Sequence, residues 1–138
     1  MEKKRILVID DETTFTKMLR LNLEKTGRFE VREENRGRRG AAAAREFHPD
    51  LIFLDVIMPD VDGGEVAALI QSDPKLKGVP VVFLTATVSK REVGETGNLR
   101  GGLFFLAKPV TTEQLIECID KHLPPPASPP ETAPTPAP

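Results

Sequence analysis

Runs of consecutive apolar residues alternate along the chain with stretches in which apolar residues recur at helical spacing. The runs predicted as β-strands cover residues 5–10, 29–33, 51–54, 80–84 and 103–106. The stretches predicted as helices cover residues 13–26, 38–47, 65–72 and 112–123. A further helix within residues 89–100 is expected to be short or irregular, because Gly94 and Gly97 interrupt it.

The strands differ in how their polar residues are placed. Residues 51–54 and 80–84 are apolar throughout, as expected for strands buried on both faces of a parallel sheet. Residues 29–33 alternate between apolar and polar side chains, which is typical of an edge strand. We therefore expect central strands flanked by a half-exposed one.

The helix ends also carry local signals. We expect Asp11 or Thr13 to cap the first helix and Gly27 to stop it. Thr111 or Thr112 is expected to cap the last helix, whose residues Leu115, Ile116, Ile119 and Leu123 are expected to face inward.

Regular alternation of strand and helix predicts an α/β protein with a mostly parallel sheet and helices on both faces. A (β/α)₈ barrel needs about 250 residues, and this chain has 138. The expected fold is therefore a doubly wound (βα)₅ flavodoxin-like sheet of strand order 2-1-3-4-5. Its ligand site should lie outside the carboxyl ends of strands 1 and 3.

Composition separates a folded domain, residues 1–123, from a proline-rich segment, residues 124–138. Eight of the fifteen residues in this segment are proline. It cannot form a core, and we expect a disordered or polyproline-like tail. A linker to an output domain and a ligand for a proline-binding module remain open alternatives.

Charge and hydropathy exclude several classes of protein. The net charge of −2 gives no general attraction to nucleic acid or to an anionic membrane. A single cysteine, Cys118, cannot form an internal disulfide. The apolar runs are too short for a signal peptide or a membrane span. We expect a cytoplasmic protein without direct contact to nucleic acid or membrane.

Three acidic residues follow the two strands that flank the expected ligand site. Asp10 and Asp11 end the first strand and Asp55 ends the third. Aspartates after strands are often only helix caps. Three carboxylates at one sheet edge repel one another unless a cation joins them, and Mg²⁺ prefers such oxygen ligands. The pattern predicts a Mg²⁺ site.

Residues at the ends of the fourth and last strands could help Asp55 to bind a phosphoryl group. A carboxylate such as Asp55 can act as a nucleophile towards phosphorus. Lys108 ends the last strand and can reach a phosphoryl oxygen, and Thr85 ends the fourth and can donate a hydrogen bond to another. Each of these two residues alone is a weak signal.

The chain resembles the response-regulator receiver domains of two-component signalling over about residues 4–123. The matching pieces are residues 8–12 (VIDDE), 50–59 (DLIFLDVIMP), 62–63 (DG), 84–86 (LTA) and 108–109 (KP). Single pieces are common in proteins, but their order and spacing together are specific to this family.

The resemblance implies that Asp55 accepts a phosphoryl group from a phosphohistidine of a sensor histidine kinase or phosphotransfer protein. It implies that Asp10, Asp11, Asp55 and the backbone carbonyl of Ile57 form the Mg²⁺ site, and that Lys108 contacts the phosphoryl group. Thr85 and Phe105 would be the switch residues that respond to phosphorylation and control binding to an unidentified downstream protein. The implied oligomeric state is a monomer or a weak phosphorylation-dependent dimer.

The resemblance implies that the protein is a phosphoacceptor rather than an enzyme. Slow self-dephosphorylation is expected, because the apolar Ile57 side chain cannot orient an attacking water. An aspartyl-phosphate phosphatase would want an acid at that position. A constitutive interaction module on the same fold remains the alternative. A flavin carrier is disfavoured, since Asp10, Asp11 and Glu12 would repel its phosphate.

The other charged and reactive residues indicate no further site. Arginines of the second strand–helix unit are interleaved with glutamates and are expected to form a solvated face. His48 and His122 lack metal-ligand spacing and are expected to be structural. Cys118 is expected to be a small, at least partly buried residue of the last helix.

Overall fold

A computed structural model describes residues 3–85, 99–100 and 103–123 of the chain. The strands are β1 (Lys4–Ile9), β2 (Phe29–Glu34), β3 (Leu51–Asp55), β4 (Val81–Thr85), β5 (Leu99–Arg100) and β6 (Leu103–Ala107). The helices are α1 (Thr13–Glu24), the 3₁₀ turn η1 (Gly37–Arg39), α2 (Gly40–Phe47), α3 (Gly63–Ser72) and α5 (Thr112–His122).

The strands form one sheet of order β2-β1-β3-β4-β6-β5. All neighbours pair in parallel except β5, which pairs antiparallel to β6. The five long strands therefore have the expected order 2-1-3-4-5, with β6 as the fifth. The two-residue β5 was not expected, and it lies in the stretch where a weak helix was predicted. The rest of that helix falls outside the described residues.

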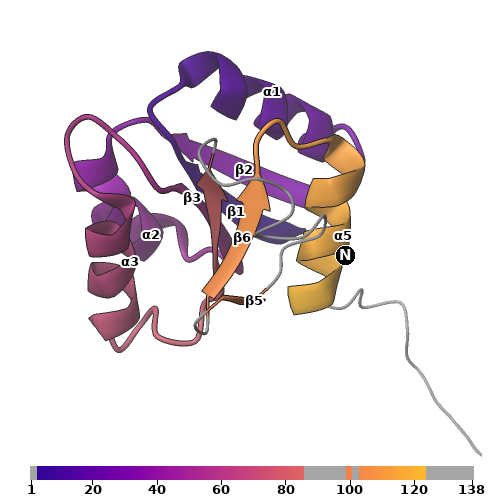
Figure 1. Cartoon of the computed structure of the whole chain (residues 1–138). Coiled ribbons are helices and arrows are strands. Elements are labelled where there is room, and N and C mark those ends of the chain that lie inside the picture. Colours follow the sequence, from indigo (N-terminus) through magenta and orange to yellow (C-terminus); the bar gives the residue numbers. More distant parts are fainter. Residues whose placement is uncertain (1–2, 86–98, 101–102, 124–138) are drawn as a thin grey trace, which may run out of the picture.

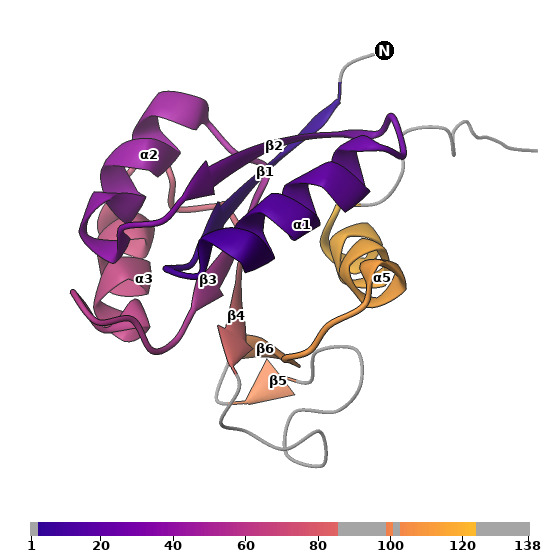
Figure 2. The ribbon, with the colours of Figure 1, turned by 90° about the horizontal axis from the view of Figure 1, so that it is seen from above.

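Helices cover both faces of the sheet (Figure 1), and the view from above separates the two layers: α1 and α5 lie on one side, α2 and α3 on the other (Figure 2). Each layer closes its own apolar core. The α1–α5 side buries residues such as Leu19, Leu23 and Ile119 against the sheet. The opposite side buries Ala43, Ile70 and other residues of α2 and α3. Central strands thus bury both faces, which explains their uninterrupted apolar runs.

Helix α5 begins as predicted, whereas α1 does not. The Thr111 hydroxyl accepts a hydrogen bond from the Gln114 N–H, and the Gln114 side chain accepts one from the Thr111 N–H, which forms a capping box. The N-cap of α1 is Glu12, and its side chain makes no capping hydrogen bond. Asp11 does not cap, because its carboxylate lies in an acidic cluster with those of Asp10 and Asp55. Thr13 is already the first helical residue.

The remaining boundaries differ only slightly from those predicted. Helix α1 ends at Glu24, three residues before Gly27, which has a positive φ of 79°. The start of the second predicted helix is a 3₁₀ turn, η1, followed by α2. Leu115 and Ile119 are buried, and Ile116 and Leu123 pack against the same core, as expected. In the described part of the chain, no helix is both long and apolar enough to cross a bilayer.

Candidate functional site

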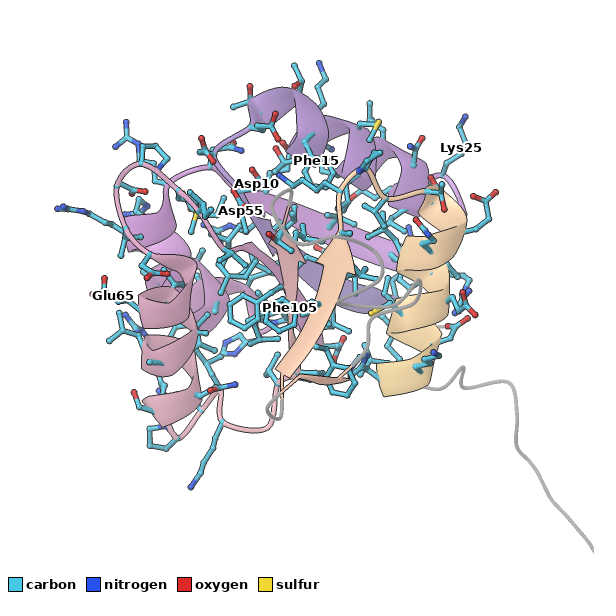
Figure 3. The ribbon with its side chains drawn as sticks, in the orientation of Figure 1. Asp10, Phe15, Lys25, Asp55, Glu65 and Phe105 are labelled. Atoms are coloured by element: carbon cyan, nitrogen blue, oxygen red, sulfur yellow. The ribbon has the colours of Figure 1, made fainter. Side chains whose placement is uncertain are left out.

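Asp10 and Asp55 meet at the carboxyl edge of the sheet. Ile9 of β1 pairs in register with Leu54 of β3, so the next residue of each strand is an aspartate beside the other. Asp11 follows Asp10, and each of the three residues places a carboxylate oxygen within 4.8 Å of those of the other two. Figure 3 shows Asp10 and Asp55 side by side at this edge. Asp10 is fully buried and Asp55 is 7% exposed, whereas Asp11 is exposed.

Lys108, at the end of β6, points its ammonium into this cluster. Its Nζ lies 2.7 Å from Asp10 Oδ2, 3.1 Å from Glu12 Oε1 and 4.0 Å from Asp55 Oδ1. The backbone N–H of Lys108 donates to the carbonyl of Thr85 at 2.9 Å, which fixes the start of the loop after β6. The Lys108–Pro109 peptide bond is cis. By these distances the Lys108 ammonium lies closer to Asp10 and Glu12 than to Asp55.

The negative charges near Asp55 are only partly neutralised by Lys108. Burial raises the pKa of the Asp55 carboxyl from its usual 3.8 to about 6, and the neighbouring charges of Asp10 and Asp11 add to the rise. Lys108 and the backbone N–H of Ile57 lower this pKa without cancelling the rise. For Lys108, burial lowers the pKa, but Asp10, Glu12 and Asp55 raise it by more. A further cation beside Asp55 would therefore be favoured.

A hydrogen-bond network behind Asp10 holds its backbone in place. The side-chain amide of Asn35 donates to the Asp10 carbonyl at 2.8 Å and to the Thr16 hydroxyl at 2.9 Å. The fully buried Thr16 donates to Glu33 Oε1 at 2.7 Å, and Arg20 pairs with the other oxygen of Glu33 at 2.6 Å. These roles could not be predicted from the sequence, since the partners are remote from one another along the chain and are common surface residue types.

The loop between β3 and α3 is anchored at both ends. The Val56 N–H donates to the Leu84 carbonyl, and the Gly63 N–H donates to the Val56 carbonyl at 2.9 Å. Gly63 packs so closely that a Cβ there would overlap the Asp55 carbonyl oxygen. The Asp62 side chain caps α3 by accepting from the Gly64 N–H. These contacts fix the backbone directly after Asp55.

A second set of contacts ties the middle of this loop to η1. The Arg38 N–H donates to Asp60 Oδ2 at 3.0 Å, and the Arg38 guanidinium donates to the Asp60 carbonyl at 3.2 Å. The N–H of Arg38 also lowers the pKa of the Asp60 carboxyl. Between these anchors Ile57 pairs with Asp62 across the loop, and Ile57 is 61% exposed.

The two expected switch residues lie on the same face of the sheet, because Thr85 follows Phe83 by two positions on β4 and Phe105 pairs in register with Phe83. Thr85 is buried at the end of β4, where it pairs in register with Ala107. Phe105 is half-buried and stacks on Phe83, its direct neighbour on β4, with ring centroids 5.3 Å apart. Phe104 packs on the opposite side of the sheet, against the α1–α5 core. Adjacent phenylalanines thus point to opposite faces, as their positions in a strand predict.

The donor set suits a hard divalent cation. Carboxylate oxygens from Asp10, Asp11 and Asp55 converge, and Mg²⁺ is bound through such ligands together with retained water. Asp10 Oδ2 is buried, and Lys108 is its ion-pair partner at 2.7 Å. An additional cation at this point would neutralise a cluster that carries more negative than positive charge.

The other side chains considered from the sequence lie away from this edge. Arg32 pairs with Glu46 and Arg39 with Glu34, as expected for a solvated charged face. His48 is exposed at the end of α2. In α5, the His122 ring lies 2.9 Å from the Cys118 carbonyl. Cys118 is buried, which raises the pKa of its thiol to about 11.

A doubly wound parallel sheet whose carboxyl edge gathers three aspartates and a lysine defines a receiver-type signalling domain. The family described as the response regulator receiver domain matches residues 6–120. The chain belongs to this family.

Individual relatives agree with this assignment. The chain is 31% identical over 122 residues to the polar-differentiation response regulator DivK of Brucella ovis, covering 87% of this chain and 96% of that protein. It is 33% identical over 119 residues to Protein PilH of Pseudomonas aeruginosa, covering 86% and 97%. The structure of the chemotaxis protein CheY4 of Vibrio cholerae superposes with a TM-score of 0.74 at 27% identity, covering 88% of this chain and all of that one.

Proposed function

We propose that this response regulator is a Mg²⁺-dependent phosphoacceptor and that Asp55 receives the phosphoryl group. The observation that carries the proposal is the convergence of Asp10, Asp11 and Asp55 within 4.8 Å, with the Lys108 ammonium 4.0 Å from Asp55. The donor would be the phosphohistidine of a sensor histidine kinase or phosphotransfer protein. Residues 1–123 would form the receiver domain of a cytoplasmic protein, and residues 124–138, which lie outside the described part, a tail or linker.

In the transfer step, a carboxylate oxygen of Asp55 attacks phosphorus. An O–P bond forms while the P–N bond of the phosphohistidine breaks, and its electron pair leaves with the imidazole nitrogen. Mg²⁺, when bound, would offset charge on the phosphoryl oxygens. Asp10, Asp11, Asp55 and the Ile57 carbonyl would hold the ion. Lys108 would turn from Asp10 and Glu12 towards a phosphoryl oxygen, as a mobile point charge can.

The phosphorylated state would then be read through Thr85 and Phe105. The Thr85 hydroxyl would donate to a phosphoryl oxygen, and the Phe105 ring would leave its stack on Phe83. The altered surface would control binding to a downstream protein, by a monomer or a weak phosphorylation-dependent dimer. The apolar, exposed Ile57 side chain offers no group to activate water, so we expect slow self-dephosphorylation and no turnover as an enzyme.

The test combines intact-protein mass spectrometry with amide NMR in Mg²⁺, comparing acetyl phosphate or beryllofluoride with buffer. We expect one phosphoryl adduct in the wild type and none in Asp55→Asn, with signals shifting as far as Thr85 and Phe105. Asp50→Asn is the matched control, because Asp50 precedes the same strand at its other end. An adduct that survives in Asp55→Asn would refute Asp55 as the acceptor. A wild type that takes no adduct would favour a constitutive interaction module.

A further inference from the structure

Phe15, in the first turn of α1, lies against the lysine of the site. The Lys108 Nζ is 4.6 Å from the centroid of the Phe15 ring, within the roughly 6 Å over which an aromatic face attracts an ammonium. Phe15 is half-buried and also flanks the α1–α5 core. Figure 3 shows it beside Asp10 and Asp55 at the same edge of the sheet.

The ammonium has several competing anionic neighbours. Asp10 is buried, whereas the Glu12 carboxylate lies at the surface with its side chain 60% exposed. A lysine that followed Glu12 outward would lose its approach to Asp55, which is already the most distant of its three acids. The Lys108 side chain is nevertheless only 13% exposed. An aromatic face beside the ammonium contributes to keeping it inside the site.

We propose that Phe15 is a positioning residue, whose ring holds the Lys108 ammonium within reach of the phosphoryl group on Asp55. The attraction comes from the negative face of the ring and the positive charge of the lysine. It has no preferred hydrogen-bond direction, so Lys108 can turn from Asp10 to a phosphoryl oxygen without leaving the ring. This inference rests on the proposed function, since it assigns Phe15 to the same transfer step.

The simpler explanation is that Phe15 only fills space beside the core. The two explanations separate when the ring keeps its shape but loses the negative charge of its face. Successive fluorination of the ring weakens its attraction for a cation while leaving its packing nearly unchanged. Phe15→Leu removes the aromatic face and keeps an apolar side chain, whereas Phe15→Tyr keeps the face.

The experiment introduces mono-, di- and trifluorophenylalanine at position 15 of the full chain. It measures the rate of Asp55 phosphorylation by acetyl phosphate in Mg²⁺ and the free energy of unfolding. NMR of the Lys108 ε-methylene, in protein without phosphodonor, gives a readout independent of phosphorylation. Phe104 is the matched control, because it flanks the same core but meets the His122 ring edge-on rather than a lysine.

We expect the rate to fall stepwise with fluorination, reaching about a three- to tenfold loss in the trifluoro variant and in Phe15→Leu, with Phe15→Tyr close to wild type. NMR should show the Lys108 ε-methylene group becoming more mobile in the same order. Fluorination of Phe104 should change neither the phosphorylation rate nor the mobility of this group. Equal rates throughout the Phe15 series, in a protein that is phosphorylated normally, would overturn the role of Phe15 alone. Failure of the wild type to accept phosphate would overturn the proposed function and this inference with it.

Discussion

The Lys108 ammonium lies 2.7 Å from Asp10 and 4.0 Å from Asp55. Lys108 thus pairs more closely with Asp10, which we do not expect to react, than with Asp55. Asp55 keeps a carboxylate that is buried, close to two other acids and incompletely neutralised, and its pKa rises to about 6. The same imbalance favours binding of a metal cation and the departure of Lys108 from Asp10 when a phosphoryl group arrives.

The raised pKa of Asp55 predicts how stability depends on pH. The folded state binds the Asp55 proton more tightly than the unfolded state, so ionised Asp55 destabilises the fold fully above about pH 6 and not at all below about pH 4. Without metal, Asp55→Asn should raise the free energy of unfolding at pH 8 by about 1–3 kcal/mol, since a shift of about two units corresponds to this range.

Chemical denaturation in a chelator between pH 4 and pH 8 measures this effect. The gain from Asp55→Asn should shrink as the pH falls through 6. Glu117→Gln, which removes an exposed carboxylate of α5, is the control for the loss of one negative charge. A gain in Asp55→Asn that is the same at pH 4 and pH 8 would contradict the raised pKa.

The acidic cluster predicts a stabilising response to Mg²⁺. A ligand that binds only the folded state, at ten times its dissociation constant, adds about 1.4 kcal/mol to the free energy of unfolding. Titrating Mg²⁺ at pH 7 should show this gain in the wild type and a weakened one in Asp11→Asn, which removes an exposed member of the cluster. Asp50→Asn, at the other end of β3, should respond like wild type. An undiminished response in Asp11→Asn would exclude Asp11 as a ligand.

The close approach of Gly63 predicts that the loop after Asp55 tolerates no side chain there. A Cβ at Gly63 would overlap the Asp55 carbonyl oxygen and lie 2.9 Å from Val56 Cα. Gly63→Ala should lower the free energy of unfolding by about 1–3 kcal/mol, as overpacking does, and slow phosphorylation by displacing Asp55.

Gly64 is the matched control, because it is the next residue of the same helix and a Cβ there would make only an ordinary contact with Asp62. Gly64→Ala should be neutral or slightly stabilising, as alanine is in a helix. Thermal or denaturant unfolding compares the two variants. Equal effects of the two substitutions would show that the loop is free to move.

The network behind Asp10 predicts a cost for removing one hydroxyl. Thr16→Val preserves the shape of the buried side chain but leaves the half-buried Glu33 and Asn35 groups without their shared partner. We expect a loss of about 1–3 kcal/mol in the free energy of unfolding. Thr14→Val, at an exposed position of the same helix, should change it little. If both variants unfold alike, the network does not stabilise the fold.

Much of the fold follows from local patterns. The apolar runs gave the five long strands within about a residue of their observed bounds, because a strand covered on both faces must be apolar throughout. The cap of α5 was also predictable, since Thr111 and Gln114 are close in sequence. The N-cap of α1 was predicted wrongly, because the Asp11 carboxylate lies in the cluster with Asp10 and Asp55. The antiparallel β5 carried no pattern long enough to recognise.

Local patterns along the chain are enough to specify the alternation of strands and helices. They also place the three acids, the hydroxyl and the lysine at the ends of strands. Those features depend on neighbours along the chain and on the rule that parallel strands end at one edge. Tertiary packing sets three further features: Lys108 lies closer to Asp10 than to Asp55, Asn35 and Thr16 support Asp10, and Phe15 lies over the lysine. Such choices depend on distances of a few ångströms between side chains that are remote in sequence, and no periodicity along the chain encodes them.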